Sequence, residues 1–239
     1  MILGYIDIHT HIIPDVDDGA KDFEDSIKTI RQLKEQGIDT IIATPHRRSN
    51  LFDFNREKIR NNFRELTRIL DEQGLEVRLE LGAEYYFGAD LFEDISSGEV
   101  YTLGSSDYIL VEFKNLRFTV QDKENLFRIF TSGYRVIVAH IERNRFNSES
   151  FSGLDYLRDN SALFQCDIMS LSGLWGEQAR LFMEELIKRN YVDIVSTDVH
   201  CKDFESDLIE RGFLRLSEVN NGLKERCMGD NIKKRLGLI

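Results

Sequence analysis

Short runs of apolar and β-branched residues alternate with longer amphipathic stretches along most of the chain. Strand character is found at 5–8, 38–44, 75–83, 108–113, 134–139, 161–168 and 191–197. Helical periodicity follows most of these runs, at 22–37, 55–73, 122–132, 151–160, 176–189 and 203–217. Strands that alternate with helices predict βα units with right-handed crossovers and a parallel sheet.

The chain shows no obvious division into separate domains. No linker rich in Pro, Gly or Ser, no internal repeat and no low-complexity tract interrupts the alternation. We therefore expect one domain over residues 1–239, a length that suits a single α/β barrel. An open doubly wound sheet fits the same periodicity, so the pattern of apolar residues does not choose between the two folds.

The positions of the histidines favour the barrel. All five histidines lie at the carboxyl end of an apolar run: His9, His11, His46, His140 and His200. Three carboxylates behave likewise, Glu84 just past the third run, Glu112 in the fourth and Asp198 at the end of the seventh. These residues are spread over most of the chain, but a parallel barrel brings the carboxyl ends of all its strands into one ring. A closed or nearly closed barrel would therefore gather them in one place.

The spacing of these residues indicates a metal site. Side chains at positions i and i+2 of a strand point to the same face, so His9 with His11, and Asp198 with His200, would each aim two groups at one centre. Imidazoles and carboxylates without thiolates are suited to zinc, iron or manganese. A single histidine is more often an ordinary polar residue, and His46 or His140 alone would prove nothing. Five histidines with three acidic partners predict a metal centre.

Composition and charge exclude several classes of protein. A hydrophobic fraction of 41% excludes disorder, and a net charge of −11 disfavours long nucleic acids or an anionic membrane as partners. The cysteines, Cys166, Cys201 and Cys227, form no Cys-x-x-Cys pair, so a reducing cytoplasm fits best. The chain begins without a basic leader, and no apolar run approaches the roughly 18 residues of a membrane span. We expect a soluble cytoplasmic protein with no membrane insertion.

Six motifs in order resemble a known family. They are HTHIIPDVDDG (9–19), ATPHRR (43–48), GAEYY (82–86), VEF (111–113), AHIER (139–143) and STDVH (196–200). Together they resemble the polymerase and histidinol phosphatase (PHP) superfamily, and within it they are most similar to the bacterial capsular-polysaccharide tyrosine-protein phosphatases. The resemblance covers about residues 5–201 and implies a distorted (β/α)7 barrel with parallel strands and outer helices.

The resemblance also implies a ligand set for two or three divalent ions, with Mn²⁺ first and iron or zinc as alternatives. His9, His11, Glu84 and Asp198 would hold the first ion, Glu84 would bridge to a second ion with Glu112 and His140, and Asp18, His46 and His200 would hold the third. Only the resemblance selects Asp18, because Asp15 and Asp17 lie beside it in a loop that usually forms a solvated turn.

The implied chemistry is metal-assisted hydrolysis of a phosphomonoester. Clustered divalent ions lower the pKa of a bound water, supply hydroxide near neutral pH and neutralise the phosphoryl oxygens. By the resemblance, Arg143, three residues past His140, matches the family's phosphate-binding arginine and is a candidate for catalysis as well as for substrate binding. A planar guanidinium suits this task, since it pairs with two phosphate oxygens.

Other residues are candidates for binding the substrate. Arg47 and Arg48 directly follow a predicted ligand and are candidates for binding phosphate, Arg47 also for catalysis, although a solvated basic loop is an equal alternative. Tyr86, beside Tyr85, is a candidate for stacking on an aromatic substrate, with a packed rim residue as the alternative. The family usually has a further arginine after the Asp-x-His pair, where this chain has only Lys202.

Competing mechanisms are weaker. A cysteine-dependent phosphatase needs an arginine six positions after its nucleophile, but Ser172, Asp207 and Lys233 stand at those positions. A histidinol-phosphate phosphatase or a nucleic-acid phosphoesterase of the same superfamily remains an alternative, whereas a non-catalytic barrel would lack ligands. We predict a metal-dependent protein-tyrosine phosphatase whose partner is a phosphotyrosine protein, the tyrosine-rich tail of a bacterial kinase of capsule or exopolysaccharide assembly.

Overall fold

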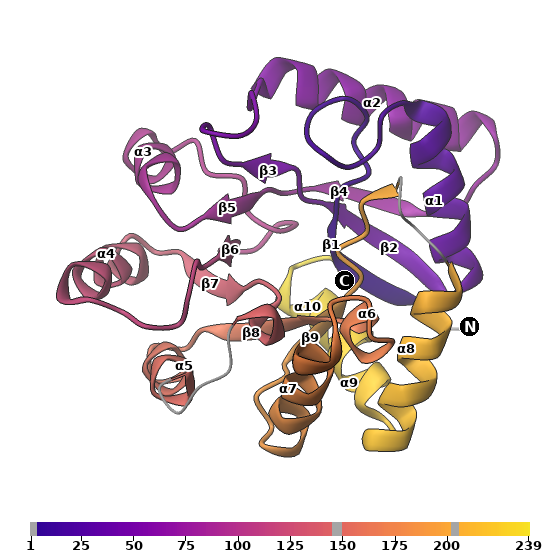
Figure 1. The fold of residues 1–239 in the computed structure, drawn as a ribbon. Helices are drawn as coiled ribbons and strands as arrows, with labels where there is room; N and C mark the ends of the chain where they lie inside the picture. The colour runs from indigo at the N-terminus through magenta and orange to yellow at the C-terminus, as the bar shows by residue number, and fades with distance from the viewer. Residues whose placement is uncertain (1–3, 145–149, 202–205) are drawn as a thin grey trace.

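Strands occupy the centre of the molecule and helices lie around them (Figure 1) in the computed structural model, which describes residues 4–144, 150–201 and 206–239. The strands are β1 (Tyr5–Thr10), β2 (Ile38–Ala43), β3 (His46–Arg47), β4 (Arg78–Leu81), β5 (Glu84–Tyr86), β6 (Tyr108–Glu112), β7 (Arg135–Val138), β8 (Leu163–Asp167) and β9 (Ile194–Ser196). The helices are α1 (Phe23–Glu35), α2 (Arg56–Glu72), α3 (Ala89–Ser97), α4 (Val120–Thr131), the 3₁₀ helix η1 (Ile141–Arg143), α5 (Ser150–Asp159), α6 (Ile168–Leu171), α7 (Glu177–Lys188), α8 (Ser206–Val219), α9 (Leu223–Met228) and α10 (Asp230–Arg235).

The strands form two parallel sheets, in the orders β1-β2-β4 and β3-β5-β6-β7-β8-β9. A single parallel bridge between Thr10 and Val199 links the end of β1 to the segment after β9. The hydrogen-bonded ladders are therefore not continuous around the ring. The carboxyl ends of the strands nevertheless meet at one end, as the sequence predicts for a barrel.

Two short strands, β3 and β5, were not predicted. The predicted second strand, 38–44, corresponds to β2, which ends before Pro45, a residue with no N–H to donate to a ladder, and β3 follows this proline. The predicted third strand, 75–83, corresponds to β4, and β5 begins beyond its predicted end, after Gly82, where a Cβ atom would lie 2.7 Å from Leu103 Cδ2. Close packing at that point leaves little room for a side chain.

An apolar cluster fills the interior of the ring. Its members include Ile8, Ile42, Leu110 and Ile137 from the strands and Ile232, Leu236 and Leu238 from the C-terminal segment. Lys233 of α10 donates a hydrogen bond to the carbonyl oxygen of Gly4 just before β1, so this segment covers the end of the ring where the strands begin. The C-terminal helices thus pack on the barrel. The polar residues of the predicted metal site lie at the opposite end of the ring.

Side-chain hydrogen bonds cap the first turns of α1 and α4. Asp22 caps α1 by accepting a hydrogen bond from the backbone N–H of Asp25, and Thr119 with Asp122 forms a capping box at α4. The shorter helices α3, α6, α9 and α10 and the 3₁₀ helix η1 were not predicted individually, because so few residues show no readable periodicity. Among the described residues, no helix combines the length and the apolar character needed to cross a bilayer.

Candidate metal centre and phosphate site

The end of β1 brings two imidazoles together with two carboxylates. The Nε2 atoms of His9 and His11 lie 3.3 Å apart. Glu84 Oε2 lies 3.2 Å from His9 Nε2 and 3.4 Å from His11 Nε2, and Asp198 Oδ1 lies 3.1 Å from each. All four side chains are buried, so four ligand-type atoms from β1, β5 and the end of β9 converge on one point.

This arrangement fits a divalent cation. Glu84 Oε2 and Asp198 Oδ1 are buried and accept no well-aligned hydrogen bond from any described residue, although His46 Nδ1 lies 2.8 Å from Glu84 Oε2. Buried carboxylate oxygens are normally paired, because leaving one without a partner costs free energy. A metal ion between the two oxygens and the two imidazoles would satisfy all four groups, and histidines with carboxylates suit manganese, iron or zinc.

A second group of donor atoms lies beside the first. It consists of His11, Asp18, His46 and His200, whose ligand atoms lie within 4.8 Å of one another. Asp18 Oδ1 is 3.5 Å from both His46 Nε2 and His200 Nε2. The structure thus brings the predicted third set together and adds His11 to it.

The neighbouring aspartates have other contacts. Asp15 is exposed and pairs with Lys58 at 2.8 Å. Asp17 is buried, with its Oδ2 2.9 Å from His11 Nδ1, and it also accepts a hydrogen bond from the backbone N–H of His46. Of the three candidates in the loop, Asp18 is the one whose carboxylate lies among the histidines.

The set predicted for the second ion is looser. His140 Nε2 lies 2.9 Å from Glu84 Oε1, on the opposite side of that carboxylate from the first group. Glu112 lines the same cavity but belongs to neither of the two tight groups of donor atoms. Glu84 is therefore shared between His140 and the first group, which is the arrangement expected of a bridging carboxylate.

The backbone at this centre departs from regular strand geometry. His140 and Asp198 have φ angles of 31° and 49°, in the left-handed region that non-glycine residues rarely adopt. The segment from Asp198 to His200 is consequently not the extended pair that the i, i+2 spacing predicts, and the two side chains join different groups. Such backbone costs roughly 1–3 kcal/mol per residue and tends to occur at functional sites.

The buried charges hold one another in their ionised forms. Burial works against the charge of His9, but Asp198 and Glu84 raise its pKa above the ordinary value. Burial likewise disfavours ionised Glu84 and Asp198, yet the neighbouring imidazoles hold the pKa of each carboxyl well below its usual range. For Glu112, burial and the charge of Glu84 both raise the pKa. The carboxylates of this centre are therefore stabilised by positive charge, which protonated imidazoles or bound metal ions would supply.

Several supporting residues were not predicted. Gln165 Oε1 lies 3.3 Å from His9 Nδ1 and accepts a hydrogen bond from the backbone N–H of His140 at 2.7 Å. Asp7 is fully buried and accepts hydrogen bonds from Thr197 and from the backbone N–H of His9. Such contacts orient metal-binding side chains. The available signal was a polar residue inside an otherwise apolar strand, which both Asp7 and Gln165 show.

Arg143 lies at the edge of the centre, where it is held by two carboxylates and a tryptophan. Its guanidinium donates to Asp167 and lies 2.6 Å from Asp198 Oδ2. Its Cζ lies 3.9 Å from the centre of the Trp175 ring. Arg143 Nε is buried and has no hydrogen-bond partner among the described residues. Asp167 and Trp175 were not predicted.

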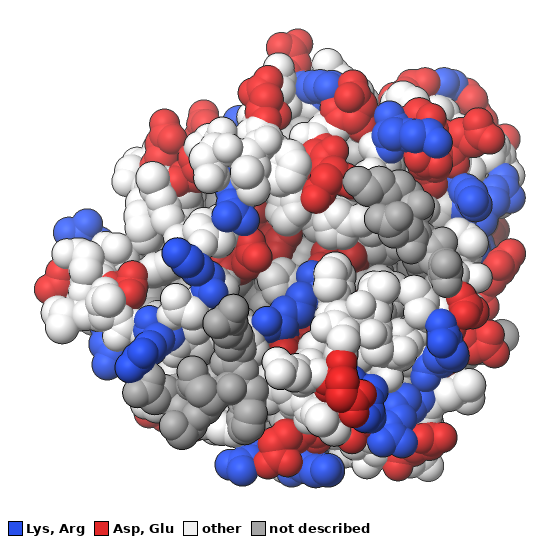
Figure 2. Space-filling view, in the orientation of Figure 1, with Lys and Arg blue, Asp and Glu red and all other residues white. Residues whose placement is uncertain are grey.

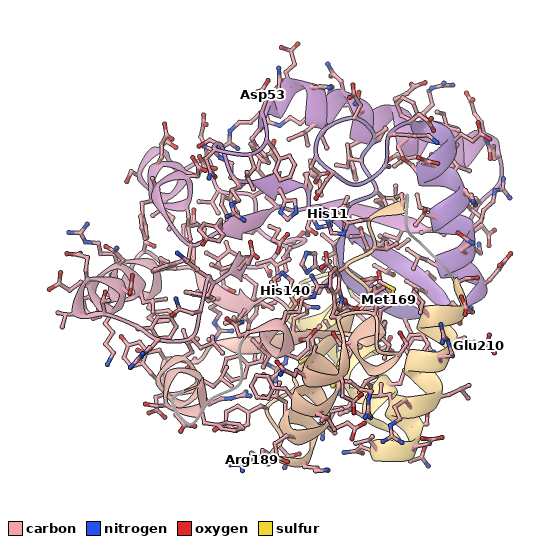
Figure 3. The ribbon with its side chains drawn as sticks, viewed as in Figure 1. His11, Asp53, His140, Met169, Arg189 and Glu210 are labelled. Atoms are coloured by element: carbon pink, nitrogen blue, oxygen red, sulfur yellow. The ribbon has the colours of Figure 1, made fainter. Side chains whose placement is uncertain are left out.

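A cavity of about 250 Å³ opens over the candidate ligands, and Arg48 and Arg143 both line it. In Figure 2, acidic atoms lie at the bottom of a hollow with basic side chains around it, and in Figure 3 His11 and His140 lie near the centre of the ring. Arg48 Nη1 lies 3.6 Å from Glu112 Oε2. The ring of Tyr86 packs against the Arg48 guanidinium at 4.0 Å and does not line the cavity. Tyr86 therefore supports an arginine instead of facing a ligand.

Arg47 points away from the cavity, contrary to the role suggested by its place in the sequence. Its guanidinium hydrogen-bonds Asp94 at 3.1–3.2 Å and lies 3.3 Å from Asp90. Arg47 does not line the cavity. Its contacts are those of a structural ion pair, and we do not assign it a role in catalysis or phosphate binding. Lys202 lies outside the described residues.

Cys201 lies close to the centre but is unsuited to nucleophilic catalysis. Its Sγ contacts the carbonyl oxygen of His11 at 3.6 Å, and burial raises the pKa of the thiol to about 11. A cysteine nucleophile requires the thiolate form near neutral pH. This geometry agrees with the absence of the arginine spacing required for a cysteine-dependent phosphatase.

A ring of parallel strands with histidines, carboxylates and arginines at its carboxyl end defines a metal-binding α/β barrel of the hydrolase type. The profile of the family described as "Capsular polysaccharide synthesis, CpsB/CapC" matches residues 5–220. The chain belongs to this family.

Named relatives support the same conclusion. The tyrosine-protein phosphatase YwqE of Bacillus subtilis is 32% identical over 195 residues, which cover 82% of this chain and 77% of the relative. The tyrosine-protein phosphatase CpsB of Streptococcus pneumoniae is 30% identical over 213 residues, covering 87% and 88%.

A solved structure of these relatives has the same fold. It is described as showing YwqE from Bacillus subtilis and CpsB from Streptococcus pneumoniae, "unique metal-dependent tyrosine phosphatases". The superposition has a TM-score of 0.85 at 28% identity and covers 98% of this chain and 94% of the other. The predicted family, the barrel-type fold and the class of metal-dependent phosphoric monoester hydrolase are confirmed.

Proposed function

We propose that the chain is a protein-tyrosine phosphatase that holds two or three divalent ions, Mn²⁺ first, and hydrolyses phosphotyrosine. The observation that carries the proposal is the convergence of His9 and His11 Nε2 with two buried carboxylate oxygens that have no hydrogen-bond partner. His9, His11, Glu84 and Asp198 would hold one ion, and Asp18, His46 and His200 with His11 would hold another. Glu84, His140 and Glu112 would hold a third.

The arginines would bind the substrate's phosphate. Divalent ions bound here would acidify a water for in-line attack and neutralise charge on the phosphoryl oxygens. Arg143 and Arg48 both line the cavity, so both guanidinium groups are placed to contact a phosphate bound there. Because Arg143 is fixed by Asp167 and Asp198, its guanidinium is oriented before the substrate arrives.

The aromatic ester suits a site with no assigned general acid. The leaving group would be the phenolate of tyrosine, whose conjugate acid has a pKa of about 10, so it departs more easily than the alkoxide of serine. The family's link to capsular polysaccharide synthesis and the names of the relatives support a phosphotyrosine protein as substrate. We propose the tyrosine-rich tail of a capsule or exopolysaccharide kinase, met in the cytoplasm, where the chain's free cysteines would remain reduced.

The proposal is tested by comparing three substrates with the manganese-loaded protein. A phosphotyrosine peptide, the same peptide with phosphoserine, and histidinol phosphate are supplied at equal concentration, and phosphate release is measured. We expect the phosphotyrosine peptide to have the highest kcat/KM. A preference for phosphoserine or for histidinol phosphate would overturn the assignment of substrate, and the latter would support the alternative phosphatase of the same superfamily.

A further inference from the structure

Apolar side chains form two edges of an otherwise polar and charged cavity. They are Leu51, Phe52 and Trp175. Leu51 is 58% exposed and Trp175 is 46% exposed, which is unusual for such large apolar residues. Their exposure is concentrated where the candidate ligands and arginines open to solvent.

The two apolar edges approach the cavity from different elements. Leu51 and Phe52 follow β3, and the Phe52 ring stacks on His46 with a centroid distance of 5.1 Å. Trp175 lies in the turn between α6 and α7, on the other side of the strand ring from β3 (Figure 1).

The turn that carries Trp175 is closely defined. Gly173 and Gly176 have φ angles of 90° and 87°, which a residue with a side chain rarely adopts. The indole N–H of Trp175 donates to Asp167, a fully buried carboxylate that also accepts from Arg143. Trp175 is thus held in place although almost half of it faces solvent, which is what a preformed wall of a binding site requires.

We propose that Trp175 is a specificity-determining residue that, with Leu51 and Phe52, receives the aromatic ring of phosphotyrosine while the phosphate reaches Arg143. This inference rests on the proposed function and deepens it, because it assigns the residues that distinguish an aryl phosphate from an alkyl phosphate. Ring contacts of this kind favour offset or edge-on packing, and Trp175 remains 46% exposed although the Arg143 guanidinium lies over its ring.

Truncation of Trp175 should separate binding of the ring from binding of the phosphate. Asp167 and Asp198 both hold Arg143, so the guanidinium should keep its position when the indole is removed. In Trp175→Leu we expect KM for a phosphotyrosine peptide to rise about tenfold, with kcat and the inhibition constant of inorganic phosphate changing less than about threefold. Trp175→Phe, which keeps a ring, should restore KM to within about threefold of the original value.

Matched variants and a direct measurement of binding complete the test. Phe127→Leu changes another exposed aromatic residue, on α4, and should leave KM unchanged. Leu51→Ser should raise KM as Trp175→Leu does, whereas Leu214→Ser, on α8, should not.

Trp175 is the only tryptophan of the chain, so its fluorescence reports on this site alone. Phosphotyrosine should protect it from quenching by acrylamide, whereas inorganic phosphate should not.

The possible outcomes separate this inference from the proposed function. An equal rise in KM and in the inhibition constant of phosphate for Trp175→Leu would overturn the inference, since Trp175 would then act only through Arg143. An unchanged KM, or no protection by phosphotyrosine, would also overturn it. If the unaltered enzyme fails to hydrolyse phosphotyrosine, the proposed function fails, and the quenching measurement still decides whether Trp175 contacts an aryl phosphate.

Discussion

Arg143 and Asp198 are joined by a contact of 2.6 Å between Nη2 and Oδ2, while the other oxygen of the same carboxylate faces His9 and His11. Asp198 therefore connects the candidate phosphate-binding arginine to the candidate metal centre. A substitution of Arg143 should therefore alter metal binding, and loss of the metal should alter the position of Arg143, because the carboxylate between them is buried.

Replacing Arg143 with lysine should lower kcat/KM for a phosphotyrosine peptide by about a hundredfold. A lysine keeps the charge but cannot offer the planar pair of donors that phosphate oxygens accept. Steady-state kinetics measure the change, and metal analysis of the same sample controls for loss of the centre. A kcat/KM within about threefold of the original value would show that Arg143 does not bind the phosphate.

Replacing Arg47 with alanine should affect folding more than chemistry. The substitution leaves Asp94, which is 2% exposed, with one arginine fewer, and we expect the free energy of unfolding to fall by about 2 kcal/mol. Arg56 still pairs with Asp94, which limits the loss. Denaturant unfolding measures the effect. A hundredfold loss of kcat in the folded variant, with an unchanged free energy of unfolding, would show that Arg47 takes part in catalysis.

Replacing Asp17 with asparagine should weaken metal binding by about ten- to a hundredfold, because the carboxylate at 2.9 Å from Nδ1 orients the His11 ring. Titration of the chelator-treated protein with Mn²⁺ measures the affinity. Asp15→Asn is a suitable control, since Asp15 lies in the same loop but is exposed and pairs with Lys58. Equal effects of the two substitutions would argue against an orienting role for Asp17.

The alternation of side chains along an extended segment explains why only one of the two neighbouring arginines lines the cavity. Alternate residues of an extended segment point to opposite sides, so His46 and Arg48 reach the cavity while Arg47 turns to Asp94. Applying this rule to the ATPHRR motif would have separated the two arginines. The convergence of the candidate metal ligands, Asp18 excepted, could be predicted because a parallel barrel brings the carboxyl ends of its strands to one place.

Other contacts depend on tertiary structure that the sequence pattern does not reveal. Gln165 contacts His9 across 156 positions, and Asp167 meets Arg143 across 24. Trp175 lies in a turn between two helices, where periodicity carries no information about direction. The short strands β3 and β5 follow Pro45 and the closely packed Gly82, and of these two residues only the proline indicates the end of a strand in the sequence.

The metal-free protein should be most stable in mildly acidic solution. Despite burial, neighbouring carboxylates raise the pKa of His9 and His11 above 6.5. The contribution of these two protonated imidazoles to the stability of the folded protein is therefore complete below pH 6.5 and is lost as pH rises through the raised values. The pKa values of Glu84 and Asp198 are lowered from 4.5 and 3.8, so their contribution is present above pH 4.5 and is lost as pH falls through the lowered values. Both contributions are therefore complete between about pH 4.5 and 6.5.

Denaturant unfolding of the chelator-treated protein at a series of pH values measures this dependence. Bound divalent ions replace the protons on the imidazoles, so the metal-loaded protein should have its stability maximum at higher pH. A metal-free protein whose stability keeps rising above pH 7 would contradict the charge arrangement described for the centre.

The most direct test of the central claim is phosphate release from a phosphotyrosine peptide before and after the metal is removed. Metal analysis of the purified protein should find two or three divalent ions per chain, as the donor groups suggest. The chelator-treated protein should be inactive, and added Mn²⁺ should restore hydrolysis. A preparation shown to be free of metal that hydrolyses the peptide at the full rate would contradict the account.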